Sequence, residues 1–186
     1  GAEALRQIFA GRMKWNLWLF MIRRSLIEAL GSSPFLPGVN MGEDLMLMGK
    51  LFHSASSVSI IHLPLYTYVR SDQQITNVYR PEHWVQVEKN VRELESYLAT
   101  HASGQELELL HFLKLNLKLP LLISTRREDF QRWSVMYAES NEYILKNKSL
   151  SFRTKLLQYM AAKKQFWFVI LYNKVIMGWL YKVLYR

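Results

Sequence analysis

The stretch PEHWVQVEKNVRELESYL, residues 81–98, carries the clearest structural signal in the chain. It begins with proline, which suits the first turn of a helix, and its apolar residues recur every three or four positions. These apolar positions are Trp84, Val87, Val91, Leu94 and Leu98. The pattern predicts an amphipathic helix with one buried face. No segment downstream of it has a strand pattern, so the rest of the chain is predicted to be helical.

Upstream of residue 81 the signals are mixed. Gly42-Glu43-Asp44 opens a predicted helix that runs to about Ala55, with its acids in the first turn, where the helix dipole favours them. Aromatic and β-branched runs predict short strands near 15–22, 57–63 and 65–70. For the first of these runs, periodicity does not distinguish a buried strand from the entry to a helix. The predicted fold class is therefore α+β and predominantly helical.

Further helices are predicted on both sides of these segments. Pro120 is expected to kink or end one of them, because proline cannot donate the backbone hydrogen bond that a helix interior needs. The predicted ranges are 2–11, 25–30, 105–123, 127–146, 151–163 and 165–185. The chain begins within the first of these helices and without methionine, so we expect it to be part of a longer protein.

Composition excludes several classes of site. Half of the 186 residues are hydrophobic, which argues against disorder. The absence of cysteine excludes disulfides, zinc knuckles and thiol nucleophiles. The five histidines lack the three- or four-residue pair spacing of a zinc site. The net charge of +9 predicts attraction to polyanions, and its concentration in an apolar C-terminal end favours lipid over nucleic acid.

An ordered set of motifs spans residues 15–78. They are Trp18, Arg23-Arg24-Ser25-Leu26, Gly42-Glu43-Asp44-Leu45 and Leu65-Tyr66-Thr67-Tyr68, followed by Arg70. In order and spacing this set resembles the C-terminal half of bacterial family 2 glycosyltransferases, which build surface polysaccharides. The chain departs from the family pattern at Leu19-Phe20, where a lysine is common, and at Gln74, where serine is favoured.

The resemblance implies a division of the chain by function. Residues 1–80 would be the acceptor-side part of a GT-A-type catalytic domain, with the predicted strands at its end. Residues 81–162 would be a helical region, and 163–186 a basic aromatic amphipathic helix. The intact enzyme would use Mg²⁺ or Mn²⁺ to neutralise the departing diphosphate. No Asp-x-Asp occurs in this chain, so we expect the metal ligands and the nucleotide-binding donor half to be absent from it and the fragment to be inactive alone.

The resemblance also implies residue roles. Asp44 would be the general base that takes a proton from the acceptor hydroxyl, and Glu43 would orient the acceptor or brace the loop. Arg70 would reach the leaving diphosphate of the nucleotide-sugar donor, since guanidinium pairs with phosphate oxygens. Trp18, Tyr66 and Tyr68 are candidate contacts to the sugar or lipid-linked acceptor. The structural alternatives are a helix cap for Glu43-Asp44, a solvated arginine, and core aromatics.

Residues 163–186 combine lysines with aromatic side chains on an apolar helix. Lys174 and Lys182 argue against a membrane-spanning segment. We expect an interfacial helix on an anionic membrane surface, which would place the protein in the cytoplasm, peripheral on the inner face of the membrane. Deletion of this helix is expected to leave the rest folded. The alternative is a helix docked on the donor half or on a second copy, as in a homodimer.

Two functions from different classes follow. The first is a glycosyltransferase fragment that moves a sugar from a nucleotide-diphosphate sugar to an acceptor hydroxyl. The alternative is a non-enzymatic helical scaffold or interaction module at a membrane surface. Nucleic-acid binding is not expected, because the charges are not interleaved with exposed aromatics on a recognisable module.

Overall fold

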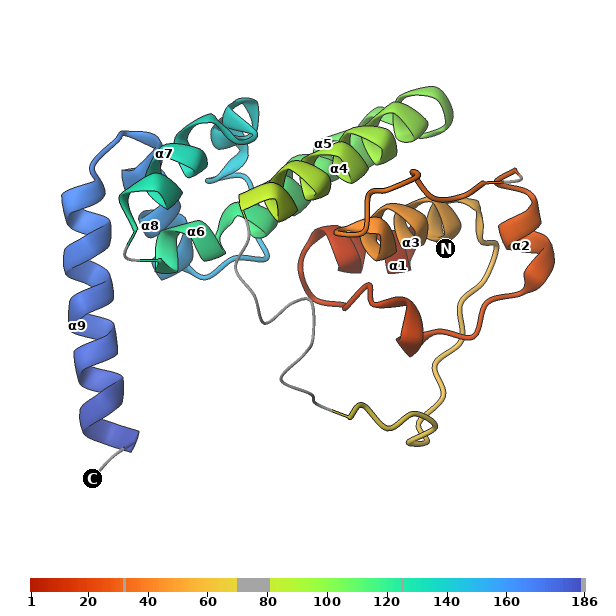
Figure 1. Ribbon diagram of the computed structural model, residues 1–186, viewed down its shortest axis with the longest axis horizontal. Coiled ribbons are helices and arrows are strands. Elements are labelled where there is room, and N and C mark those ends of the chain that lie inside the picture. The colour runs from red at the N-terminus through yellow and green to blue at the C-terminus, as the bar shows by residue number, and fades with distance from the viewer. Residues whose placement is uncertain (32, 70–80, 125, 185–186) are drawn as a thin grey trace. The chain divides into compact units, whose positions relative to one another are not determined.

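The computed structural model describes residues 1–31, 33–69, 81–124 and 126–184, with side chains described as far as Ile176. These residues form helices separated by turns and extended segments (Figure 1). The elements are α1 (Ala2–Phe9), η1 (Leu17–Leu19), α2 (Arg24–Glu28), α3 (Glu43–Ser54), α4 (Pro81–His101), α5 (Gly104–Lys118), α6 (Pro120–Ile123), α7 (Arg127–Val135), η3 (Ala138–Tyr143), α8 (Phe152–Ala162) and α9 (Phe166–Leu184). The chain divides into two compact units, 1–107 and 108–186.

The predominantly helical character is confirmed, but the predicted strands are not found in the described residues. The run at 15–22 contains the 3₁₀ turn η1, and residues 57–63 and 65–69 carry no strand. The side chains of Ile60, Leu63 and Leu65 are more than half exposed. A strand needs a neighbour to take its backbone hydrogen bonds and a surface to cover its apolar face. No strand is described at residues 57–63, and the apolar side chains of Ile60 and Leu63 in this run remain exposed to solvent.

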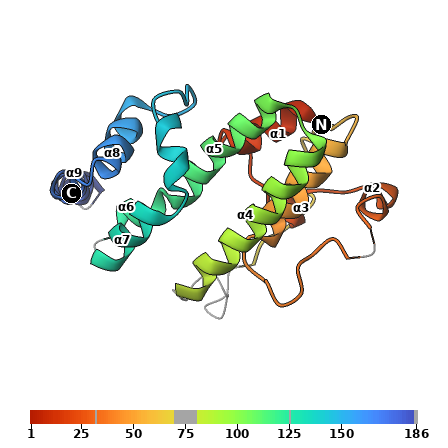
Figure 2. The same ribbon diagram turned by 90° about the horizontal axis from the view of Figure 1, so that it is seen from above.

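Helix α3 is the centre of the first unit. The eight consecutive residues from Leu45 to Phe52 are all buried, which means that the helix is covered around its whole circumference. Helices α1, α2 and α4 contact it, and α4 lies alongside it when the unit is seen from above (Figure 2). The side chains of Leu5, Ile8 and Phe9 on α1 are fully buried. The predicted helix at 81–98 therefore packs on α3 and belongs to the first unit.

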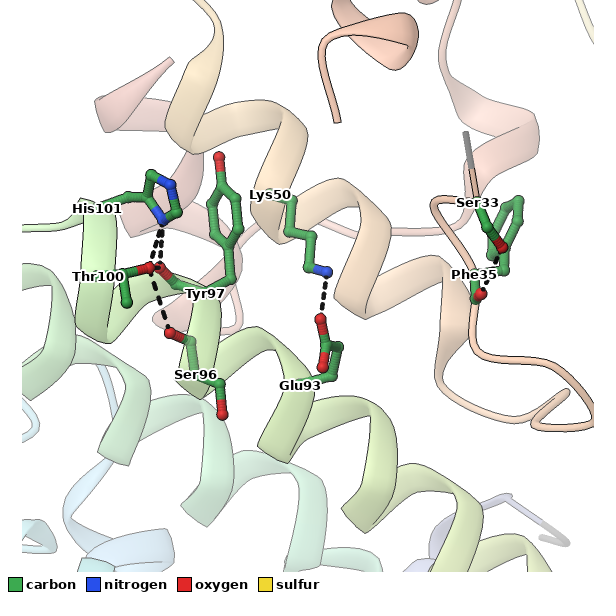
Figure 3. A network of polar contacts seen from close by, with 8 residues as sticks. All are labelled: Ser33, Phe35, Lys50, Glu93, Ser96, Tyr97, Thr100 and His101. Atoms are coloured by element: carbon green, nitrogen blue, oxygen red, sulfur yellow. Dashed lines mark hydrogen bonds and ion pairs between the residues drawn. The ribbon is translucent and has the colours of Figure 1, made fainter. Parts of the chain in front are cut away.

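A close approach and a polar network join α3 to α4. A Cβ built at Gly49 would lie 2.7 Å from the nearest side-chain atom of Leu94, so glycine lets the two helices meet. At the adjacent positions of the two helices, Lys50 Nζ lies 2.8 Å from the carboxylate of Glu93 (Figure 3). Lys50 is almost fully buried and also lies 5.4 Å from the ring centroid of Tyr97. The ion pair thus compensates for a cation in the α3–α4 interface.

The second unit packs α6, α7, α8 and α9 around buried leucines and Trp133. At its centre is a fully buried lysine, Lys118 at the end of α5. Its Nζ donates hydrogen bonds to the carbonyls of Met136 and Tyr137 and to Oδ1 of Asn141, at 2.7–3.2 Å. The same ammonium lies 4.2 Å from the ring centroid of Trp133. Lys118 therefore binds the Met136 carbonyl just beyond α7 and shares the Tyr137 carbonyl with the backbone N–H of Ser140.

The predicted helices in the second half of the chain match the observed ones closely, with two breaks. Pro120 separates α5 from α6, as expected. The range predicted as one helix, 127–146, is interrupted after Val135, because Tyr137 adopts a left-handed conformation with φ 50°. Among the described residues, no helix combines the length and apolarity needed to cross a membrane.

Candidate functional site

The candidate site is built on the first turn of α3. Gly42 precedes the helix with φ 84°, a left-handed conformation that glycine adopts without strain. A Cβ at this position would also lie 3.3 Å from the Cα of Val87 on α4. Glu43 and Asp44 follow in the first helical turn. Free backbone N–H groups and the helix dipole favour negative charge at this end of the helix.

Asp44 connects α3 to the segment that carries Trp18. Its Oδ2 accepts a hydrogen bond from the backbone N–H of Leu17 at 3.0 Å. Gly42, the N-cap of α3, has no side chain with which to cap the helix, and the Asp44 carboxylate holds a segment 27 residues earlier. Phe20 packs edge-on against Phe52 of α3, with ring centroids 5.4 Å apart. The segment 17–20 is therefore fixed to α3 at both of its ends.

An aromatic cluster lies on this anchored segment. The indole of Trp18 stacks on Tyr66 at 4.9 Å and on Tyr68 at 5.1 Å, with interplanar angles of 26° and 25°. All three side chains are more than one third exposed, so the cluster is a surface platform and not a core. We call Trp18, Tyr66 and Tyr68 the aromatic platform. The alternative that these residues are core aromatics does not fit their exposure.

Glu43 and Asp44 differ in their surroundings. Burial raises the pKa of Glu43, the hydrogen bond from its own backbone N–H opposes this, and the neighbouring charge of Asp44 raises the pKa further. Neutral Glu43 is therefore favoured more than in water. Asp44 has its carboxylate held by the Leu17 N–H. The two adjacent acids thus have different environments on one helical turn.

Helix α4 holds the loop that leads into this turn. The side-chain carbonyl of Gln86 accepts a hydrogen bond from the backbone N–H of Asn40 at 2.9 Å. Asn90, one turn further on, is fully buried and donates from Nδ2 to the carbonyl of Met41 at 2.8 Å. Its Oδ1 is buried and has no hydrogen-bond partner among the described residues. The loop before Glu43 and Asp44 is therefore fixed by two polar side chains spaced four residues apart.

Sequence reasoning missed Gln86 and Asn90. The apolar pattern of the helix assigned its buried face through valines and leucines and passed over the polar residues between them. The available signal was the position of Asn90, three residues after Val87 and four before Leu94, which places it beside them on the predicted buried face. An amide on that face must find hydrogen-bond partners in the interior.

Arg70, the predicted contact to the diphosphate, lies outside the described residues. The described residues hold no group of three or more His, Cys, Asp or Glu side chains that would bind a metal ion.

Comparison with known proteins gives no relative. The chain matches no protein-family model, no curated protein and no solved structure.

Proposed function

We propose that this chain is the acceptor-side part of a glycosyltransferase, with Asp44 as the general base. The observation that supports the proposal is that a carboxylate, Asp44, lies next to the exposed aromatic platform. The Asp44 carboxylate binds the backbone N–H of Leu17, and the next residue, Trp18, stacks on Tyr66 and Tyr68. Exposed aromatic faces offer apolar contact area to the C–H faces of sugars, and the adjacent acid can accept a hydroxyl proton.

In the proposed reaction the acceptor hydroxyl attacks the anomeric carbon of a nucleotide-diphosphate sugar. Its proton passes to Asp44, the new glycosidic bond forms, and the nucleotide diphosphate leaves with the electron pair of the broken bond. Asp44 lies in the first turn of α3, the end of a helix at which the helix dipole favours negative charge. Glu43, whose pKa is raised by burial, would orient the acceptor through a hydrogen bond. The residues that bind the donor and its metal belong, in this proposal, to a part of the enzyme outside these 186 residues.

The test uses the chain as it stands. Saturation-transfer NMR with a panel of free mono- and oligosaccharides should detect sugars bound at the aromatic platform. Trp18→Ala should abolish the signal, since it removes the central ring of the platform. Trp167→Ala, which removes an exposed tryptophan in the other unit, is the matched control and should leave the signal unchanged.

Calorimetry supplies the second arm of this test. Nucleotide diphosphates with Mg²⁺ or Mn²⁺ should show no saturable binding, because the sequence contains no Asp-x-Asp element. Saturable, metal-dependent binding would overturn the assignment of this chain to the acceptor side alone.

A second candidate function is a non-enzymatic helical scaffold, and one observation favours it. The described residues contain no strands, although a GT-A domain is built on a sheet. In this reading Asp44 only fixes Leu17 to α3, and the platform binds a protein or no ligand. Two results would favour the scaffold. One is sugar binding that survives Trp18→Ala, and the other is the absence of sugar binding together with unaltered turnover in the Asp44→Asn enzyme.

A further inference from the structure

The net positive charge of this protein arises in its last quarter. Glu142 is the last acidic residue, and nine lysines and arginines follow it. Residues 1–142 contain fifteen basic and fifteen acidic residues, so they are neutral overall. The whole net charge of +9 therefore belongs to residues 143–186. This segment forms α8, α9 and the chain that leads into them.

One face of α9 is anchored in the second unit. Val169 is fully buried, and Phe166 stacks on Phe130 of α7 with ring centroids 5.2 Å apart. Asn173 donates from Nδ2 to the carbonyl of Leu122 at 2.6 Å, which satisfies a carbonyl at the end of α6. These contacts fix the rotation of α9 about its own axis. The helix therefore presents one defined face to its surroundings.

That outward face is apolar. Trp167, Ile170, Leu171 and Val175 are between 41% and 62% exposed, although all four are large hydrophobic residues. Their spacing of three, one and four residues places them within an arc of about 140° on a helix that advances about 100° per residue. We call these four residues the α9 stripe. Lys174 is exposed and falls on the same arc.

The cations around the stripe are exposed as well. Lys163 and Lys164 lie in the turn that joins α8 to α9, and Lys164 has φ 59°, which ends α8 sharply. Lys163 Nζ lies 5.6 Å from the ring centroid of Tyr159. An apolar stripe bordered by lysines is the arrangement of helices that lie in the interface of a membrane, where the stripe enters the acyl region and the ammonium groups reach the lipid phosphates.

We propose that the α9 stripe docks on an anionic lipid surface, independently of the function proposed above. Charge complementarity selects this occupant. A second copy would bring the same stripe and its lysines together, and no acid between 143 and 186 would offset their repulsion. Nucleic acid binding is dominated by cations, whereas four of the five exposed residues described on this arc are apolar and one, Lys174, is charged.

The test is cosedimentation of the full chain with vesicles. Phosphatidylcholine vesicles containing about a third phosphatidylglycerol should bind the chain at least about tenfold more tightly than pure phosphatidylcholine, since each cation near an anionic surface adds to the attraction. Raising the salt should weaken the binding only in part, because apolar burial is not screened. Trp167→Ser with Leu171→Ser should weaken it at least about tenfold.

Two control variants make the result specific. Val135→Ser removes an exposed apolar side chain from α7, outside the cationic segment, and should leave binding unchanged. Vesicles with brominated acyl chains should quench the fluorescence of Trp167 if the α9 stripe inserts into the membrane. Trp167→Phe should therefore retain binding but show less quenching of tryptophan fluorescence, which makes the quenching a measure of insertion of the stripe itself.

Three outcomes would overturn the proposal. Equal binding to neutral and anionic vesicles would show that charge does not select the surface. A dimer in sedimentation equilibrium that Trp167→Ser with Leu171→Ser dissociates, without vesicle binding, would make the stripe an interface between copies. A shift of RNA in gel electrophoresis, again without vesicle binding, would assign the cations to nucleic acid.

Discussion

At the residue scale, Asp44 has two roles that can be separated chemically. Its carboxylate is a hydrogen-bond acceptor for Leu17, which holds the segment 17–20, and it is the proposed proton acceptor in catalysis. An asparagine retains a side-chain carbonyl that can accept the Leu17 N–H but has no useful basicity. An alanine loses both properties. The two substitutions therefore distinguish a base from a structural brace.

We predict that Asp44→Asn lowers turnover of the intact enzyme by about 10²–10⁴-fold, the scale of general base catalysis. Its free energy of unfolding should change little, while Asp44→Ala should lower it by about 0.5–1.5 kcal/mol through loss of one hydrogen bond. Urea denaturation of the chain measures the second effect, and steady-state kinetics of the proposed transferase measure the first. An Asn variant with unaltered turnover would leave Asp44 as a structural residue only.

Lys118 gives a prediction for pH. Burial lowers the pKa of Lys118 from its ordinary 10.5 to about 8, and the carboxylate of Glu139 opposes this shift. At a pH between these two pKa values, Lys118 is largely protonated in the unfolded chain and largely deprotonated in the folded chain. The contribution of Lys118 to the free energy of unfolding should therefore rise with pH across this window, by at most about 1.4 kcal/mol per pH unit.

The measurement is urea denaturation of the parent chain and Lys118→Met at pH 7.5, 9 and 10. The parent should gain stability relative to the variant as pH rises, because methionine at this position removes the titrating group. Stability curves that stay parallel in the two proteins would show that the buried amine keeps its ordinary pKa.

At the element scale, packing decides where sequence patterns succeed. The heptad-like positions at Val91, Leu94 and Leu98 predicted α4 because those residues meet a real surface, the buried face of α3. The run 57–63 has equally good strand residues, but nothing in the described chain pairs with it. A local sequence pattern produces a helix or strand only when another part of the protein packs against it or pairs with it. A single sequence does not show which part that is.

The candidate site has the same limit. Motif order placed Asp44 at the start of a helix, and the structure has it there. The stacking of Trp18 on Tyr66 and Tyr68 joins residues 48 and 50 positions apart through a loop, which no local periodicity encodes. Tyr137 likewise interrupts a predicted helix by adopting a left-handed conformation, which is not predicted for a tyrosine.

The contact between α3 and α4 supplies a prediction at this scale. Gly49→Val would place a branched side chain where even a Cβ approaches Leu94 to 2.7 Å. Both helices are anchored by other contacts, so the variant should lose about 1–3 kcal/mol of stability through overpacking. Combining it with Leu94→Ala should recover part of that loss, which a double-mutant cycle of urea denaturation curves would measure. Strictly additive effects would show that the two positions do not share this space.

At the scale of the whole molecule, the second unit is both the cationic part of the chain and a packed body. Its positive charge lies on helices whose inner faces form the core, so α9 is part of the fold as well as a candidate lipid-binding element. Apolar periodicity alone predicted a detachable C-terminal helix. The burial of Val169 and the hydrogen bond from Asn173 to Leu122 argue instead that α9 completes the unit.

Deletion of residues 163–186 should therefore destabilise the second unit and not merely release the chain from lipid. The deletion removes the fully buried Val169, the ring that stacks on Phe130 and the donor that satisfies the Leu122 carbonyl. Loss of one buried aliphatic side chain alone typically costs about 1 kcal/mol or more. Hydrogen exchange should show loss of protection in α6 and α8 after the deletion. Trp167→Ser with Leu171→Ser, which alters only exposed side chains of the same helix, should keep that protection. Equal protection in the deleted and parent chains would mean that α9 contributes nothing to the core and serves only as an attachment.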